Sequence, residues 1–342
     1  NDTDAETLAG SFGFFANGFT AAQSSSTNGN GVNFIYMAIR RGGMQTPTAA
    51  SDVFSTQLQN AGGSYTKTTG FVADMILQAS RDTVLVKRPY DRLRGGSKYL
   101  ETSSTSAEAS GGTMEFDNST GYTGVTSLNT VDWIWKRARG YFDVICYTGD
   151  NSQHNENHNL GVVPEMIWTK SRNHTYEWGV YHKDIGVGAA NGSNGTGLTL
   201  NTSDGLNAGA DSPLYQHPTA TQFQPRGRQN QTKNYIAYLF ATLAGVSKVG
   251  SFTQSGATNV DCGFTGDTPS FIIIKRTDDT GDWYIFDSER GIVAGNDPYL
   301  ELNSTDAEVT NTDIVDPYSG GFATTSSLTN GDYIFYAIAA TS

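Results

Sequence analysis

The sequence predicts an all-β protein made of tandem β-sandwich modules, each of roughly 100 residues. Three observations carry this prediction. A hairpin motif recurs along the chain, glycine and small polar residues separate short β-branched and aromatic runs, and helix signals are nearly absent. The best helical candidate is the segment 74–80.

The best-defined motif is the hairpin at 269–291, PSFIIIKRTDDTGDWYIFDSERG. Residues 271–274 form a β-branched and aromatic run, which predicts a strand buried on both faces. The polar turn 277–282 contains Gly281, which is free to take a positive φ, and leads into a second strand at 283–286.

The same hairpin occurs earlier in the chain. Pro164 and Trp178 lie 105 residues before Pro269 and Trp283 (269 − 164 and 283 − 178), so the spacing is kept across the turn. A looser copy begins at 83–88, where the second strand is missing. We therefore expect Trp178 and Trp283 to occupy equivalent, buried positions in two sandwiches of the same topology.

A closing strand with an aromatic residue fixes the period. Its copies are at 33–36, 132–135, 234–237 and 332–335, in steps of 99, 102 and 98 residues (132 − 33, 234 − 132 and 332 − 234). The repeat predicts a back half-module at 1–43 and whole modules at 44–139, 140–246 and 247–342. The expected core markers of the repeat are Phe34, Trp133, Trp178, Tyr235, Trp283 and Tyr333.

Strands in the last module are expected at 249–253, 270–275, 283–287, 299–302, 321–324 and 333–339. A propeller blade has four strands in about 40 to 50 residues, so this period is too long for one blade. A two-sheet sandwich in each module fits the period better.

The half-module at 1–43 would leave strand edges and an apolar face uncovered. We expect upstream sequence or a neighbouring subunit to complete it. In the second case Phe34 and Tyr36 would form an assembly contact of a homo-oligomer or filament.

Composition excludes several classes of function. The net charge of −12 argues against a nucleic-acid partner, whose phosphates attract basic proteins. The longest apolar run is much shorter than the roughly 20 residues of a spanning helix, so no membrane insertion is expected. Cys146 and Cys262 lie at non-equivalent repeat positions, which favours free thiols over the alternative of a disulfide.

The motifs of the last two modules resemble a known family. They include a Tyr-Thr-Gly turn, a Pro-x-x-Ile-Ile/Trp-x-Lys strand, a Trp-x-x-Phe/Tyr strand and a closing Asn/Asp-Tyr-Ile strand. One module carries them at 147–149, 158–164, 178–182, 198–201 and 235–240, and the next at 264, 269–276, 283–287, 299–303 and 333–337. This pattern is similar to the tandem module of tail-fibre and other virion structural proteins of tailed bacteriophages, marine ones especially. The resemblance is weak at 44–139, where the tryptophan strand is lost.

The resemblance implies a non-enzymatic virion structural protein, exposed on the particle, without catalytic residues or a cofactor. Its partners would be further copies of itself and other virion proteins. A tail-fibre or surface-appendage segment that projects and assembles is the first expectation, with possible host contact. The alternatives are a glycan-binding receptor-recognition module, a capsid decoration protein and a polysaccharide depolymerase.

One dense basic segment stands out in this acidic protein. It contains Lys87, Arg88, Arg92, Arg94 and Lys98, in a stretch expected to be a glycine-ended loop. Two interpretations remain open for it. The segment contacts an acidic face of a neighbouring module or subunit, or it binds an acidic glycan or phosphate.

Two patterns are typical of metal ligands, but neither predicts a site. His154 and His158 have H-x-x-x-H spacing, which directs both imidazoles to one metal only on a helix, whereas this segment is an Asn-rich loop. Asp278, Asp279 and Asp282 surround a turn whose carboxylates more often cap their own backbone. We predict no metal and no cofactor.

Signatures of catalysis are weak. The sequence has no G-x-S-x-G elbow, and its S-x-x-K motif, Ser64 to Lys67, lacks the usual companion motifs. Paired carboxylates of a glycosidase are a three-dimensional property that sequence does not exclude. The tryptophans mostly lie at repeating strand positions, which favours a core role over stacking on sugars.

Overall fold

The computed structural model describes residues 43–187, 197–206, 212–266 and 268–340, and two short strands nearer the N-terminus. The chain divides into two compact units, Asn1–Gly43 and Met44–Ser342. In the first unit, β1 (Phe12–Phe15) and β2 (Gly18–Ala21) form an antiparallel hairpin. Phe34 and Tyr36 lie outside the described residues, so their assembly contact stays a prediction.

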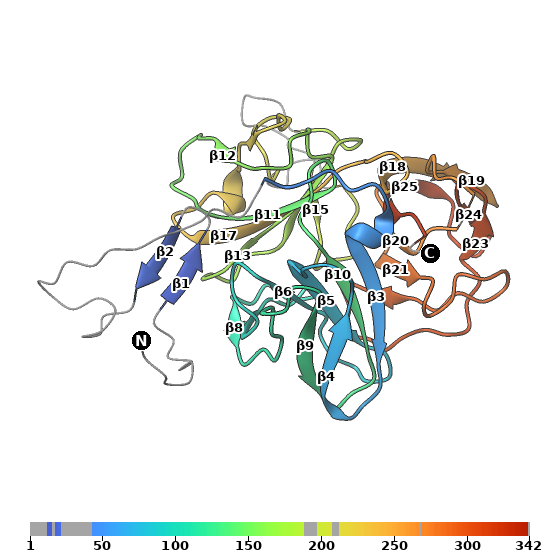
Figure 1. Cartoon of the computed structure of the whole chain (residues 1–342). Helices are drawn as coiled ribbons and strands as arrows, with labels where there is room; N and C mark the ends of the chain where they lie inside the picture. Colours follow the sequence, from blue (N-terminus) through green and yellow to red (C-terminus); the bar gives the residue numbers. More distant parts are fainter. Residues whose placement is uncertain are drawn as a thin grey trace, which may run out of the picture. The chain divides into compact units, whose positions relative to one another are not determined.

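The second unit consists of antiparallel strands, which confirms the all-β prediction (Figure 1). Its first part contains β3 (Phe54–Gln59), β4 (Gly63–Thr68), β5 (Met75–Ser80), β6 (Arg88–Asp91), β7 (Lys98–Tyr99), β8 (Ala109–Ser110), β9 (Gly121–Thr126) and β10 (Thr130–Trp135). Then follow β11 (Phe142–Thr148), β12 (Glu156–Asn157), β13 (Met166–Ser171), β14 (Gly179–His182), β15 (Leu198–Thr199), β16 (Gln222–Phe223) and β17 (Asn234–Phe240). The last part contains β18 (Ser247–Gln254), β19 (Thr258–Asp261), β20 (Phe271–Arg276), β21 (Trp283–Asp287), β22 (Leu300–Glu301), β23 (Val315–Tyr318), β24 (Gly321–Thr324) and β25 (Gly331–Ile338). Two short 3-10 turns are Ala50–Asp52 and Gly227–Gln229.

Three main sheets share one strand order. Sheet I is β3-β10-β5-β6, sheet II is β11-β17-β13-β14-β15, and sheet III is β18-β25-β20-β21-β22. In each, the last long strand of the segment lies between the first strand and a hairpin. The sheets draw their strands from the ranges 44–139, 140–246 and 247–342. Because Met44–Ser342 is one compact unit, the division into separate modules stays a prediction.

The pairing register defines equivalent positions in the three sheets. The central strand of each sheet has one anchor residue that pairs with the first strand on one side and with the hairpin on the other. These sets are Trp135 with Phe54 and Met75, Phe240 with Phe142 and Met166, and Ile338 with Ser247 and Phe271. Every equivalence below is counted from these anchors. In this register Thr130, not Trp133, corresponds to Tyr235 and Tyr333 (135 − 130, 240 − 235 and 338 − 333), so the predicted copy of the closing strand at 132–135 is three residues out of step.

Trp178 and Trp283 are equivalent in this register. Trp178 lies four residues before His182, which pairs with Met166, and Trp283 lies four residues before Asp287, which pairs with Phe271 (182 − 178 and 287 − 283). Both indoles are buried, with 0% and 1% exposure.

One hydrophobic cluster contains residues of all three main sheets. Trp135 and Phe142 join sheets I and II with ring centroids 6.4 Å apart, and Trp135 contacts Phe271 of sheet III at 5.3 Å. Phe240 and Tyr336 join sheets II and III at 5.1 Å. Since buried aromatic residues contribute large apolar areas, this shared cluster ties the three sheets into one core.

Smaller sheets cover the other faces. Shared hydrophobic clusters show that sheet I is covered by β4-β9 and β7-β8, sheet II by β12-β16, and sheet III by β19-β24-β23. Alternation along β10 shows the two layers, because Trp133 and Trp135 belong to the shared cluster while Ile134 belongs to an outer cluster with Tyr65 and Tyr122. The predicted sandwich character is confirmed.

Two local predictions are wrong. Residues 74–80 are not helical, because β5 pairs with β10 and β6 and is almost entirely buried, which overrides its helix-forming residues. The loose hairpin copy is also misplaced, because residues 83–87 connect two strands and do not form one. The hairpin of sheet I consists of β5 and β6, and β6 lies in the stretch expected to be a basic loop.

The reason for Gly281 also differs from the prediction. Gly281 is absent from the residues with positive φ. A Cβ at this position would instead lie 2.9 Å from the Cβ of Arg276, so close approach within the hairpin requires glycine.

In the last segment, β21 and β24 have the predicted bounds, and four other strands overlap their predicted ranges. The strands β19 and β23 were not expected. β23 contains Pro317, which argues against a strand in the sequence. Proline is tolerated here because β23 is an edge strand that pairs with β24 alone.

Candidate functional site

The contacts between the main sheets repeat in cyclic order. In each contact, a backbone amide in the segment of one sheet donates to a backbone carbonyl in the segment of another sheet. The acceptor belongs to the residue directly after β5, β13 or β20. These bonds run from Glu108 to Arg172, from Leu206 to Thr277 and from Glu308 to Arg81, each with an N–O distance of 2.8 Å. Sheet I thus contacts II, II contacts III and III contacts I. We call these three contacts the junctions.

Tryptophan side chains cross two of the junctions. Trp178 Nε1 donates to the Glu101 carbonyl at 2.8 Å, and Trp283 Nε1 donates to the Thr199 carbonyl at 3.1 Å. The equivalent residue in sheet I is Lys87, four residues before Asp91. Its ammonium group bonds the carbonyls of Ser304 and Asp306 at 2.8 and 2.7 Å. These bonds cross the third junction.

One lysine lies beside each of the two tryptophans, on the neighbouring strand. Lys170 and Lys275 lie on β13 and β20, beside Trp178 and Trp283, and donate across the same junctions to Thr105 and Ser203 at 3.0 and 2.9 Å. In sheet I this position is Ala79. A Trp–Lys pair in sheets II and III therefore corresponds to a Lys–Ala pair in sheet I.

Two junctions contain a buried Asp–Arg–Glu cluster. In sheet I, Arg94 Nε bonds Asp91 at 2.5 Å, and Arg94 Nη1 lies 3.7 Å from Glu108. Tyr238 of sheet II donates its hydroxyl to Asp91 at 2.9 Å. All three groups are largely buried, and burial is tolerated because each charge has an opposite charge and hydrogen bonds.

The same cluster recurs in sheet III. Arg290 bonds Asp287 at 2.5 Å and Glu308 at 3.1 Å. Trp133 Nε1 of sheet I donates to Asp287 at 3.0 Å. Trp133 is equivalent to Tyr238, so each cluster accepts one hydrogen bond from the central strand of another sheet.

Sheet II replaces the whole cluster. His182, Ile185 and Leu206 stand where sheet I has Asp91, Arg94 and Glu108. His182 is fully buried, its Nδ1 accepts from the Asp184 amide at 3.2 Å, and burial lowers its pKa to about 4. The concerted change removes two carboxylates and the guanidinium together, which leaves no unpaired charge.

The predicted basic segment is not one surface patch. Lys87 and Arg94 are buried in junctions, so neither is accessible to an external ligand. Arg92 bonds the carbonyls of Ala73 and Phe116, and Lys98 bonds the Ser110 hydroxyl at 2.6 Å. Arg88 lies over the Tyr99 ring at 4.4 Å. Lys87 and Arg88 are separated because successive side chains of an extended segment point to opposite faces, and Arg92, Arg94 and Lys98 lie beyond the end of β6.

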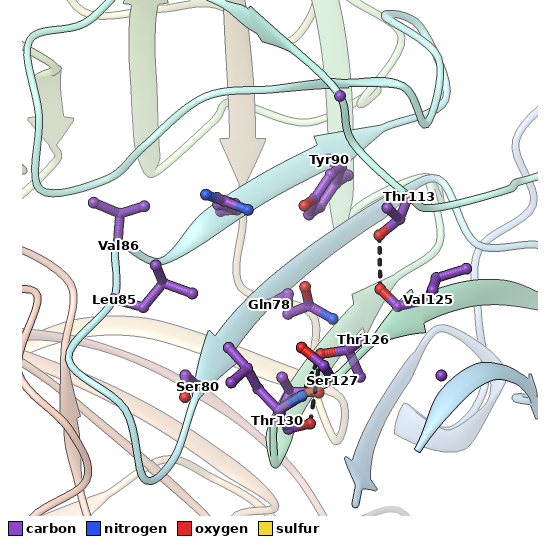
Figure 2. Close-up of a pocket in the computed structure, with 14 residues that line it drawn as sticks. Gln78, Ser80, Leu85, Val86, Tyr90, Thr113, Val125, Thr126, Ser127 and Thr130 are labelled. Carbon is purple, nitrogen blue, oxygen red and sulfur yellow. Dashed lines mark hydrogen bonds between the residues drawn. The ribbon is translucent and has the colours of Figure 1, made fainter. Parts of the chain in front are cut away.

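A groove of about 360 Å³ lies over the outer face of sheet I (Figure 2). Gln78, Ser80 and Thr130 come from the main sheet, and Val125 comes from β9. The other lining residues are Gly63, Leu85, Val86, Arg88, Tyr90, Gly111, Thr113, Thr126, Ser127 and Leu128. Arg88 is the one member of the basic segment that lines it.

A buried carboxylate lies beside the groove. Asp132 has no exposed surface and accepts hydrogen bonds from Tyr65 Oη at 2.8 Å, Tyr122 Oη at 2.7 Å and Gln78 Nε2 at 2.9 Å. Burial raises its pKa, whereas these three donors oppose that shift. The equivalent positions in sheets II and III are Ala237 and Phe335, so this polar network belongs to sheet I.

The candidate metal ligands have other partners. His154 bonds Glu156 at 2.9 Å, and His158 bonds the Thr219 carbonyl at 3.1 Å. Asp278 pairs with Arg276 at 2.8 Å, and Asp282 accepts from Asn303 at 2.7 Å. Among the described residues, no group of three or more His, Cys, Asp or Glu side chains is placed to hold a metal ion.

The two cysteines and the lysine of the S-x-x-K motif were also singled out in the sequence. Cys146 and Cys262 are free thiols whose pKa values burial raises to about 11 and about 12. Lys67 of the S-x-x-K motif donates to the Leu58 carbonyl at 2.8 Å.

Sequence reasoning missed the junction clusters. The signal was present as Asp-x-x-Arg in both DRLR at 91–94 and DSER at 287–290. Asp132 carried no such signal, because its burial depends on the outer layer.

Comparison with known sequences gives one family match. The sequence model of a domain of unknown function (DUF7483) matches residues 49–341. The chain belongs to this family. The DUF7483 match runs through all three main sheets, so the cycle of junctions lies within a single family domain. No curated protein and no solved structure gives a significant match. Within the described part of the chain, no helix is long and apolar enough to cross a membrane.

Proposed function

We propose that this DUF7483 chain is a non-enzymatic structural protein of a phage virion, a segment of a tail fibre or other surface appendage that projects and assembles. The observation that carries the proposal is the cycle of junctions. Lys87, Lys170 and Lys275 each donate to backbone carbonyls across a junction, so these buried cations hold sheets together.

The carboxylates of the junctions have the same role. Asp91 and Asp287 are fully buried and bonded to Arg94 and Arg290. A general acid or base must reach a reacting group, and these carboxylates are enclosed by their partners. These buried carboxylates therefore serve packing between sheets and not catalysis. This use of charge suits a rigid building block.

The sequence motifs support the virion assignment. Three of the strands that resemble phage virion modules, β13, β20 and β21, carry the junction residues Lys170, Lys275 and Trp283. Some residues of the repeated motif thus also join the sheets. Further copies of the chain and other virion proteins are the proposed partners, and the particle surface is the proposed location.

Particle analysis tests the proposal. Mass spectrometry of purified particles should detect the chain at a constant ratio to the major capsid protein. Gold-labelled antibodies should then locate it on the tail, a fibre or another appendage. Label confined to the capsid would favour a decoration protein, and absence from purified particles would refute the virion role.

Enzyme activity is tested separately. The protein is incubated with host capsule or lipopolysaccharide, and reducing ends are measured. We expect no release above that of heat-denatured protein. Release that depends on folded protein would overturn the non-enzymatic part of the proposal and favour a depolymerase.

A further inference from the structure

The groove over sheet I is open where the other two sheets are filled by aromatic rings. Sheets II and III each stack two rings at one end of the central strand, Tyr147 on Tyr235 and Phe252 on Tyr333. Their centroids are 5.0 and 5.3 Å apart, with interplanar angles of 14° and 11°. At the equivalent paired position, sheet I has Gln59 and Thr130. Two small polar side chains replace two rings, and Thr130 lines the groove.

Two polar atoms of the groove lining have no partner. Thr130 is 2% exposed, and its Oγ1 has no hydrogen bond among the described residues. The same holds for Nε of Arg88. Buried polar groups normally have a hydrogen-bond partner. Both atoms are enclosed in the wall of the groove, and they mark this wall as polar and incompletely satisfied.

Arg88 carries a charge that the described part of the protein does not neutralise. Arg94, six residues along the chain, is paired with Asp91 at 2.5 Å, whereas Arg88 stacks on Tyr99 and forms no ion pair with any described residue. A stacked guanidinium has a fixed orientation and bonds carboxylates in two places. This position favours a ligand with a carboxylate.

The rest of the lining is suited to hydroxyl groups. Gln78 donates its amide nitrogen to Asp132 and Tyr65, so its amide oxygen, which has no partner in the described part of the chain, remains an acceptor. Ser127 adds a hydroxyl to the lining (Figure 2), whereas the Ser80 hydroxyl already accepts from the Thr83 amide at 3.2 Å. Val125, 47% exposed, provides an aliphatic surface. Alternating hydroxyl and aliphatic contacts match the faces of a sugar ring.

We propose that this groove binds a saccharide that carries a carboxylate, with Arg88 bonding the carboxylate and the Gln78 amide oxygen bonding a ring hydroxyl. Its volume of about 360 Å³ lies in the usual range of small-ligand sites, about 300 to 1,000 Å³. Asp132 is a positioning residue, since it fixes Gln78 through a 2.9 Å hydrogen bond. This inference goes beyond the structural role proposed above, and binding in solution does not depend on where the protein lies in a particle.

Calorimetric titration of the full chain tests the proposal. The probes are trigalacturonate and sialyllactose, with lactose as the neutral sugar and triglutamate as a carboxylate without sugar. At least one acidic sugar should bind. Lactose and triglutamate should bind at least about tenfold more weakly, because lactose has no carboxylate and triglutamate has no sugar hydroxyls.

Two variants locate the binding. Arg88→Gln should weaken binding of the acidic sugar at least about tenfold and remove its preference over lactose. Thr130→Tyr should abolish binding, because tyrosine fills this position in sheets II and III. The matched control is Arg226→Gln, which removes one charge from an arginine 5.5 Å above Tyr215 in the sheet II segment and should leave binding unchanged.

Three results would overturn the proposal. They are no binding of either acidic sugar at millimolar concentration, binding that both groove variants leave intact, and equal binding of triglutamate. Circular dichroism and thermal unfolding establish that each variant is folded. Thr130→Tyr keeps the test decisive where Arg88→Gln is unfolded.

Discussion

Lys87 and Trp178 occupy equivalent positions in sheets I and II, and each donates a hydrogen bond across a junction to a backbone carbonyl. Chemically unlike side chains thus make the same type of contact. The residue on the neighbouring strand differs as well, since Ala79 lies beside Lys87, whereas Lys170 lies beside Trp178. Each position therefore has a donor that reaches the next sheet.

Lys87→Met should lower the free energy of unfolding by about 1 to 3 kcal/mol, because the carbonyls of Ser304 and Asp306 lose a buried donor. Urea denaturation followed by tryptophan fluorescence measures the change. The control is Lys98→Met, whose ammonium group has an exposed partner. An equal loss in both variants would contradict the role of Lys87.

Trp283→Ala should lower the free energy of unfolding by about 3 to 5 kcal/mol, because a fully buried indole is replaced by a cavity. Trp283→Phe keeps most of the ring and removes the donor to the Thr199 carbonyl, so its loss should be smaller. Urea denaturation compares the two. A negligible effect of Trp283→Ala would refute its core position.

Asp287→Asn should lower the free energy of unfolding by about 3 to 5 kcal/mol, since it leaves Arg290 buried without its closest countercharge. The double change Asp287→His with Arg290→Ile copies the corresponding residues of sheet II and should cost less than the sum of the single changes. A double-mutant cycle in denaturant measures this coupling. Additive losses would show that the two residues do not act as a unit.

Acid should weaken the protein through His182. Its pKa is lowered to about 4 in the folded state from 6.5, so the folded protein favours the neutral imidazole. The stability contributed by neutral His182 is complete above pH 6.5 and is lost as the pH falls towards 4, by up to about 3 kcal/mol. Urea denaturation at intervals from pH 7 to 4 measures the slope.

The variant His182→Gln should flatten this slope. Asp297 acts in the opposite direction, because burial raises its pKa to about 6 and its protonation favours the folded state as the pH falls. The slope of His182→Gln is therefore compared with that of the unchanged protein. His154→Gln, which alters a part-exposed imidazole, is the control. Equal slopes in the unchanged protein and His182→Gln would exclude His182 as the titrating group.

Residues 44–342 should unfold in a single cooperative transition, because the three sheets share one hydrophobic cluster. The segment 140–246 alone would expose the faces of Trp168 and Phe240 and should be unfolded or self-associated. Scanning calorimetry and size-exclusion chromatography test both expectations. A folded, monomeric 140–246 segment would show that the modules are independent.

The sequence by itself determined the fold class and much of the strand pattern. Period-two alternation, β-branched runs and turn residues act locally, so β21 and β24 were predicted with their observed bounds. The spacing between Trp178 and Trp283 likewise revealed equivalent positions before their surroundings were known.

Tertiary structure decided which charged residues are accessible. Lys87, Arg88 and Arg94 form one basic run in the sequence, yet Lys87 and Arg94 are enclosed in junctions while Arg88 lines a groove. The partners that enclose Lys87 lie more than 200 residues away, at Ser304 and Asp306. Local propensity carries no information on such contacts, because desolvation and pairing of a charge depend on the neighbours that folding brings to it.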